Sequence, residues 1–156
     1  AYPCSLRYPR GSFTHTDLPE SLPFALAKSQ LLRSNSSDIL FIGYGNGVGR
    51  AYETAKCLDF EVSILDLRFV KPLDKEMLRE MAQKHKKWFV FSDSSKMGGV
   101  GSALLEFLSD EKIFGVDVTS FEYGDAFITH GKTKEVEESL GLLPEQLALK
   151  VNATLL

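Results

Sequence analysis

A regular alternation of short apolar runs and amphipathic segments, beginning near residue 38, is the feature that most constrains this fold. Four runs rich in Ile, Leu, Val and Phe predict buried strands: residues 38–43, 62–67, 88–91 and 116–121. Apolar residues recur at helical spacing in three segments between these runs: residues 49–58, 74–87 and 101–108. Because strand–helix–strand units connect parallel strands, the pattern predicts a doubly wound α/β domain, with a mostly parallel sheet and helices on both faces.

Local signals predict where several helices begin and end. Asp74 stands at an N-cap position before the apolar face that contains Met77 and Leu78. Thr133 is expected to cap a further helix that ends before Gly141. Pro144 suits the first turn of a terminal helix.

Composition and charge exclude several classes of protein. The chain has 156 residues, enough for one domain with a substantial core, and its net charge of -3 gives no general attraction to nucleic acid or anionic membranes. Its apolar runs, such as residues 39–42, are far too short to span a membrane, and no secretory signal opens the sequence. Cys4 and Cys57 lie far apart and are expected to be free thiols in a reducing cytosol.

Residues 1–33 do not follow the strand–helix pattern. Four prolines in this segment interrupt any regular element: Pro3, Pro9, Pro19 and Pro23. We expect residues 1–33 to contain the tail of a preceding domain and a linker, and residues 34–156 to form one domain. A sequence that starts without Met on such a stretch suits a piece of a longer polypeptide.

The segment GYGNGVG, Gly43–Gly49, lies between a predicted strand and a predicted helix, as a phosphate-binding loop does. Asp66 ends the next strand, near the position of the acid that binds the ribose. The spacing is wrong, however, because Val48, Arg50 and Tyr52 occupy the three positions where a third glycine could stand. A strand-to-helix turn is the favoured interpretation, although an anion at the helix N-terminus stays open.

A second glycine cluster, Gly98–Gly101, follows the third predicted strand and precedes a helix. Leu104 stands where the dinucleotide motif requires the third glycine. The segment therefore predicts a tight turn, with Ser102 supporting the first helical turn.

The three histidines, His15, His85 and His130, are scattered along the chain. None has a second ligand or triad partner at a typical sequence spacing, so we expect surface or loop positions. His130, in the segment ThrHisGly, is the best candidate for a functional role among them.

Two groups of charged residues are further candidates. Asp66, Arg68 and Lys71 follow the second predicted strand, where they are expected to form ion pairs that fix the turn. Arg7 and Arg10, in RYPRG, could form a fork for carboxylate or phosphate, or could simply be exposed in a proline-rich linker.

Six motifs in order, RYPRG, GYGNGV, DLRFVKPLD, MGGVGSA, DAFITHG and GLLPEQL, resemble the final segment of the 1-deoxy-D-xylulose-5-phosphate synthase family. That family belongs to the transketolase superfamily, and the resemblance covers essentially the whole chain. Other transketolases and the 2-oxoacid dehydrogenase β subunits share only a looser glycine and helix pattern.

The resemblance implies part of an enzyme that condenses pyruvate with glyceraldehyde 3-phosphate to 1-deoxy-D-xylulose 5-phosphate and CO2, a precursor of isoprenoids and thiamine. It implies thiamine diphosphate and Mg²⁺, bound outside these residues, and a homodimer in the bacterial cytoplasm, without nucleic acid or membrane partners. The family's GDG…N motif for magnesium and diphosphate does not occur in this sequence. We therefore expect the chain alone to be inert, with no catalytic, cofactor-binding or metal-binding residue.

The resemblance also implies that RYPRG closes a pyrimidine-binding-type domain and that Arg10 contacts the phosphate of glyceraldehyde 3-phosphate, with Arg7 a neighbouring candidate. Relatives often carry two acids where this chain has Ser92 and Asp93, so no role is carried over to the first of these positions. Two alternatives stay open: a stand-alone Rossmann-like domain for a nucleotide or small molecule, and the C-terminal domain of another transketolase-superfamily enzyme. A pure assembly module overlaps with the favoured interpretation.

Overall fold

The computed structural model describes residues 3, 5 and 18–156. Its strands are β1 Gln30–Arg33, β2 Ile39–Gly43, β3 Ser63–Asp66, β4 Lys87–Ser95 and β5 Asp117–Tyr123. Its helices are α1 Asn46–Lys56, α2 Lys75–Lys84, α3 Val100–Asp110, α4 Thr133–Ser139 and α5 Pro144–Leu155. Within the described residues, no helix combines the length and apolar character that crossing a membrane requires.

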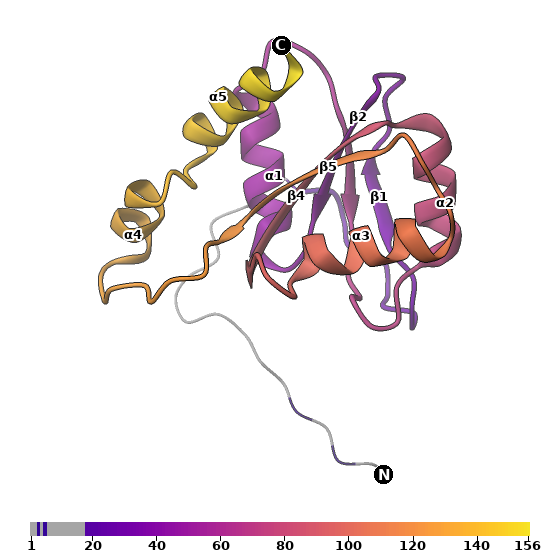
Figure 1. Cartoon of the computed structure of the whole chain (residues 1–156), viewed down its shortest axis with the longest axis horizontal. Helices are drawn as coiled ribbons and strands as arrows, with labels where there is room; N and C mark the ends of the chain where they lie inside the picture. The colour runs from indigo at the N-terminus through magenta and orange to yellow at the C-terminus, as the bar shows by residue number, and fades with distance from the viewer. Residues whose placement is uncertain (1–2, 4, 6–17) are drawn as a thin grey trace.

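The strands form one sheet in the order β1-β3-β2-β4-β5 (Figure 1). β2 pairs in parallel with both β3 and β4, and β4 pairs in parallel with β5, whereas β1 runs antiparallel to β3. The chain moves from β2 to one side of the sheet and then crosses to the other side at β4. The predicted doubly wound, mostly parallel sheet is confirmed.

The sheet has helices on both faces because its central strands alternate large apolar side chains between the two sides. Leu40 and Ile42 face α2 and α3, whereas Phe41 between them faces α1 and α5. Trp88 and Phe89 continue this alternation on β4. Figure 1 shows the two helix layers on opposite sides of the sheet. Both cores are therefore specified by the register of the two central strands.

β1 was not predicted from the sequence. No regular element was expected among residues 1–33, and this is wrong for Gln30–Arg33, which place Gln30 opposite Asp66 on β3. The last interrupting proline, Pro23, lies before the strand and so removes none of its donors. The assignment of residues 1–33 to a preceding domain and linker as a whole stays a prediction.

The residues predicted at the starts of the helices are confirmed with one exception. Asp74 caps α2 as predicted, since its Oδ1 accepts a hydrogen bond from the Met77 amide at 3.2 Å. Pro144 begins α5, also as predicted. The prediction that Thr133 caps α4 is wrong, because Lys132 stands at the cap and Thr133 is already helical.

Candidate functional site

Parallel strands end at the same edge of a sheet, and doubly wound folds bind ligands there, where the strand order reverses. In this chain the reversal lies between β2 and β4. Both glycine segments, Gly43–Gly49 and Gly98–Gly101, follow these two strands. This carboxyl edge of the sheet is therefore the candidate functional site.

The first glycine segment brings α1 against the sheet. A Cβ atom on Gly47 would lie 1.8 Å from the carbonyl oxygen of Phe91 on β4, and one on Gly43 would lie 2.4 Å from the Cα of Val48. Gly47 therefore lets α1 approach β4 closely, although none of the three positions tested for a third glycine carries one. The start of α1 thus packs directly against the end of β4.

Arg50, on α1, is buried and is paired with carboxylates of the same chain. Its Nη2 donates to Asp93 Oδ1 at 2.9 Å and to Glu137 Oε1 at 2.6 Å, while Asn46 Nδ2 donates to Asp93 Oδ2 at 2.9 Å. Burial alone would lower the pKa of the Arg50 guanidinium, but the charges of Asp93 and Glu137 raise it overall. Arg50 Nη1 has no hydrogen-bond partner within the described part of the chain. The cation thus ties α1 to the end of β4 and to α4.

The second glycine segment receives a buried carboxylate from β5. Glu122 is 7% exposed, and its Oε1 accepts hydrogen bonds from the Val100 amide at 2.9 Å and the Ser92 hydroxyl at 2.8 Å. The Ser94 hydroxyl donates to the same oxygen at 2.8 Å, and the Gly101 amide donates to Oε2 at 3.2 Å. Glu122 therefore occupies the position that an anionic ligand would take at the N-terminus of α3.

Glycine is required in this turn because the end of β4 and the residues of β5, Glu122 among them, lie so close. A Cβ on Gly101 would be 2.8 Å from Glu122 Oε2, and one on Gly99 would be 2.0 Å from the Ser95 carbonyl oxygen. Ser102 supports the turn as predicted, since its Oγ accepts from the Gly98 amide at 3.1 Å. The predicted tight turn is confirmed, but the carboxylate of Glu122 that it encloses was not among the predicted site residues.

The turn after β3 contains the predicted ion pair. Arg68 Nε donates to Asp66 Oδ2 at 3.3 Å, and the Arg68 amide donates to Asp66 Oδ1 at 3.2 Å. Arg68 has a φ of 57°, in the left-handed region. Burial raises the pKa of Asp66, although the bonded guanidinium acts in the opposite direction. Lys71 is exposed to solvent.

The remaining candidates do not assemble into a second site. His130 is exposed on the loop after β5, as predicted. His85 lies just after α2, outside any helix or strand, as the prediction of a surface or loop position allows. It is buried, however, at 3% exposed, and donates from Nδ1 to the Ser37 carbonyl at 2.7 Å. His15, Arg7 and Arg10 lie outside the described residues.

No group of three or more His, Cys, Asp or Glu side chains suited to a metal ion occurs among the residues that the structure covers. A shallow pocket of about 250 Å³ lies instead near the C-terminal ends of α2 and α3. Its lining includes three charged residues, Arg79, Lys86 and Glu111, of which Arg79 and Glu111 pair with each other at 2.8 Å. The described residues thus offer no ligand set for magnesium and no free cation fork for a diphosphate at the carboxyl edge.

The fold and this carboxyl edge define a doubly wound domain that satisfies its helix N-terminus and its buried arginine with its own carboxylates. A family model described as the transketolase C-terminal domain matches residues 27–147, a span that starts just before β1. The chain belongs to the transketolase C-terminal domain family.

Matches to individual curated proteins point to one enzyme within this family. The chain is 77% identical over 152 residues to the 1-deoxy-D-xylulose-5-phosphate synthase of Sulfurimonas denitrificans, a match that covers 97% of the chain and 25% of the relative. It is 57% identical over 151 residues to the synthase of the same name from Nitratiruptor sp., covering 97% of the chain and 24% of that protein. The chain thus spans about a quarter of the length of these relatives. The resemblance drawn from the six motifs is confirmed.

Solved structures agree on the fold. A split-gene transketolase described as an "inactive beta4 tetramer", where beta names a subunit and not a strand, matches with a TM-score of 0.75 and 25% identity. The match covers 87% of this chain and 46% of that chain. The transketolase of Campylobacter jejuni matches with a TM-score of 0.59 and 16% identity, over 87% of this chain and 20% of that protein, and shows the fold alone.

Proposed function

We propose that this chain is the C-terminal, non-catalytic part of a thiamine-diphosphate-dependent synthase that condenses pyruvate and glyceraldehyde 3-phosphate to 1-deoxy-D-xylulose 5-phosphate and CO2. The observation that carries the proposal is the 77% identity over 97% of the chain to a synthase of that name. Identity at this level over a continuous domain supports a shared role in the same enzyme.

Thiamine diphosphate and Mg²⁺ would bind outside this chain, as the family resemblance implies. Within the complete enzyme the cofactor supplies the carbanion chemistry. The domain would contribute packing and contacts in a homodimer in the bacterial cytoplasm. The split-gene transketolase, described as an inactive tetramer of one subunit type, supports both self-association and the inactivity of such a part alone.

The substrate contact would come from RYPRG. Arg10 would bind the phosphate of glyceraldehyde 3-phosphate by charge-assisted hydrogen bonds, and Arg7 would be a weaker neighbour. Neither arginine is among the described residues, so this assignment depends on the motif.

A chimera tests the proposal directly. The matching quarter of the Sulfurimonas denitrificans synthase would be replaced by this chain, and product formation from pyruvate and glyceraldehyde 3-phosphate measured. We expect an active chimera and an inactive control that lacks this quarter. A folded chimera without activity would contradict the proposal, as would micromolar, saturable binding of NAD or AMP to this chain in calorimetry.

The same chimera tests Arg10. The substitution Arg10→Ala should raise the KM for glyceraldehyde 3-phosphate by roughly 10- to 100-fold, because about 1.5–3 kcal/mol of charge-assisted hydrogen bonding is lost. Arg7→Ala serves as the matched comparison and should have a smaller effect. Affinity for thiamine diphosphate should not change. An unaltered KM in Arg10→Ala would remove the assignment.

A further inference from the structure

Large apolar side chains that are exposed to solvent gather at the carboxyl edge of the sheet. Each follows the end of a strand: Tyr44 comes after β2, Met97 after β4, and Phe127 and Ile128 after β5. Their exposed fractions are 36%, 72%, 106% and 44%, in that order. Because β2, β4 and β5 are adjacent parallel strands, these four residues lie along one edge, and we call them the edge patch.

Backbone hydrogen bonds between the strand ends fix the base of the edge patch. The Tyr44 amide donates to the Phe91 carbonyl at 3.0 Å, which attaches Tyr44 to the end of β4. The amide of Lys96, the residue before Met97, donates to the Tyr123 carbonyl at the end of β5 at 2.8 Å. The edge patch is therefore supported by the sheet itself.

The buried charges beside the edge patch already have partners within the chain. Arg50 pairs with Asp93 and Glu137, and Glu122 accepts from the amides at the start of α3. These charges therefore do not await an ionic ligand, whereas the apolar side chains above them are uncovered. Exposed aromatic and methionine side chains grouped on one face are typical of a protein interface.

The opposite, amino edge of the sheet has a different character. Charged residues stand where its strands begin: Asp38 before β2, Lys87 at the start of β4 and Asp117 at the start of β5. Lys87 Nζ pairs with Asp117 Oδ2 at 2.6 Å. Phe114, which is 81% exposed, precedes β5 at this edge and provides an aromatic control far from the edge patch.

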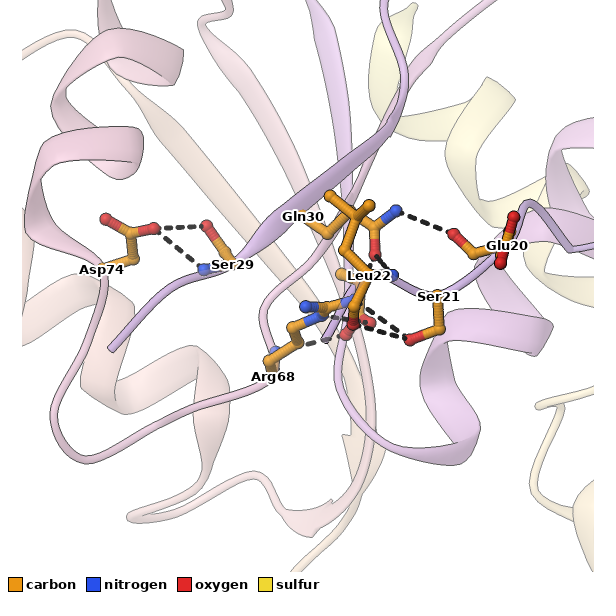
Figure 2. Close-up of polar contacts among 8 residues, drawn as sticks. Glu20, Ser21, Leu22, Ser29, Gln30, Arg68 and Asp74 are labelled. Atoms are coloured by element: carbon orange, nitrogen blue, oxygen red, sulfur yellow. Dashed lines mark hydrogen bonds and ion pairs between the residues drawn. The ribbon is translucent and has the colours of Figure 1, made fainter. Parts of the chain in front are cut away.

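The residues that precede β1 lie at the carboxyl edge as well. β1 is antiparallel to β3 and begins with Gln30 opposite Asp66, the last residue of β3. Arg68 Nη2 donates to Ser21 Oγ at 3.1 Å, and the Leu22 amide donates to Gln30 Oε1 at 3.2 Å. Figure 2 shows Ser21 and Leu22 beside Gln30 and Arg68. The chain that leads into the domain is thus attached at the same edge as the patch.

We propose that the edge patch is a docking surface for the part of the synthase polypeptide that precedes this domain. The inference rests on the function proposed above, in which the chain is the C-terminal quarter of such an enzyme. The preceding part would be joined to the domain through residues 20–22, so its effective concentration at this edge is high. A second copy of the domain has no such covalent advantage. The docked surface is expected to be apolar at its centre, with polar groups at its rim.

Hydroxyl-radical oxidation, measured by mass spectrometry, tests the docking without any activity. Oxidation of Met97 and Phe127 is compared between the 156-residue chain alone and the chimera described above. We expect both side chains to react at least about fivefold more slowly in the chimera, because the centre of an interface is shielded from water. Phe114, at the amino edge, is the matched control and should react at rates within about twofold of each other.

A charged substitution tests the same surface. In the chain alone, Phe127→Asp should leave the urea midpoint unchanged to within about 0.2 M, because this side chain is fully exposed. In the chimera it should speed oxidation of Met97 by at least about threefold, since a carboxylate is costly inside an apolar interface. Met97→Asp, followed at Phe127, is a second variant should the first chimera fold poorly. Phe114→Asp should change neither measurement.

The outcomes separate the possible occupants and the two proposals. If oxidation of Met97 and Phe127 in the chain alone falls between about 1 and 100 μM chain, a second copy covers the patch and the inference is wrong. If both residues react as quickly in an active chimera as in the chain alone, the docking inference is wrong and the proposed function stands. If the chimera is folded but inactive, the proposed function is wrong, while protection of Met97 and Phe127 still decides the docking.

Discussion

The buried carboxylate of Glu122 is expected to be the main polar determinant of stability at the carboxyl edge. Four donors converge on it: the amides of Val100 and Gly101 and the hydroxyls of Ser92 and Ser94. Removing the carboxylate would leave all four donors without their acceptor in a region shielded from water. It would also remove the anion from the N-terminus of α3.

The magnitude follows from these contacts. A hydrogen bond to a charged group is worth about 1.5–3 kcal/mol, and an unsatisfied buried donor costs about 1–3 kcal/mol. The four bonds are not additive, because the donors share one acceptor group and water can reach part of the new space. We expect Glu122→Ala to lower the free energy of unfolding by about 3–5 kcal/mol, and Glu122→Gln, which keeps one acceptor oxygen, by about 1–3 kcal/mol.

Urea unfolding of the 156-residue chain, followed by circular dichroism, measures this loss. With an m-value of about 2 kcal/mol/M, Glu122→Ala should lower the unfolding midpoint by about 1.5–2.5 M. Glu106→Ala, an exposed glutamate on α3, is the matched control and should change the free energy by less than about 0.5 kcal/mol. Equal shifts for Glu122→Ala and Glu106→Ala would refute the reasoning.

A double variant that moves the acid from β5 to β4 tests the same reasoning more strictly. Ser92 Oγ lies 2.8 Å from Glu122 Oε1, so an acid at position 92 would direct its carboxylate at the same donors. Ser92→Glu alone should be destabilising, because two carboxylates would share one buried space. The double variant Ser92→Glu with Glu122→Ser should recover most of the stability that Glu122→Ala loses. If the double variant is no more stable than Glu122→Ala, the donors bind a carboxylate only when it comes from β5.

Three further predictions concern the same domain, and each is measured by urea unfolding. Arg50→Met should lower the free energy of unfolding by about 2–4 kcal/mol, because two carboxylates lose their cation. Arg79→Met, which removes an exposed ion pair, is the control and should lower it by less than about 0.5 kcal/mol. Gly47→Ala should lower the free energy of unfolding by about 2–4 kcal/mol, because the new Cβ would meet the carbonyl oxygen of Phe91. Gly45→Ala should lower it by less, because a Cβ there meets no other atom and only the positive φ of 57° is strained. Burial raises the pKa of Asp66, so its protonated form stabilises the fold below the unfolded pKa, and this contribution is lost as pH rises through the folded pKa. The stability of wild type relative to Asp66→Asn should therefore fall with rising pH in that window, and an unchanged difference would contradict the raised pKa.

Most of the fold could be predicted from the sequence because its central strands are buried on both faces. Such strands appear as continuous apolar runs, as in residues 39–42 and 88–91, and need no knowledge of their neighbours. β1 could not be recognised in this way. It is an edge strand of four half-buried residues, and its position depends on a partner more than thirty residues away in the chain. The polar end of β4, residues 92–95, carried no strand signal for a similar reason.

The candidate site was harder to predict because its chemistry depends on pairing between distant segments. Spacing argued against a dinucleotide at Gly43–Gly49, but it could not show that Gly47 lies against Phe91. Glu122 was not singled out, because a lone glutamate near the end of a strand usually faces solvent. Its burial depends on Ser92 and on the start of α3, which only the register of β4 and β5 brings together. An acid near the end of a strand that adjoins a Gly-Gly helix start is the signal that could have found it.

At the carboxyl edge this domain meets its own polar groups with contacts inside the chain. Gly47 brings α1 directly against β4, and the carboxylate of Glu122 lies at the N-terminus of α3. A phosphate at α3 would have to displace a carboxylate that is bound by four donors. At the end of β3 the chain makes the same kind of internal contact, since Arg68 donates to Ser21 and to Gln30 and so connects residues before β1 to this edge.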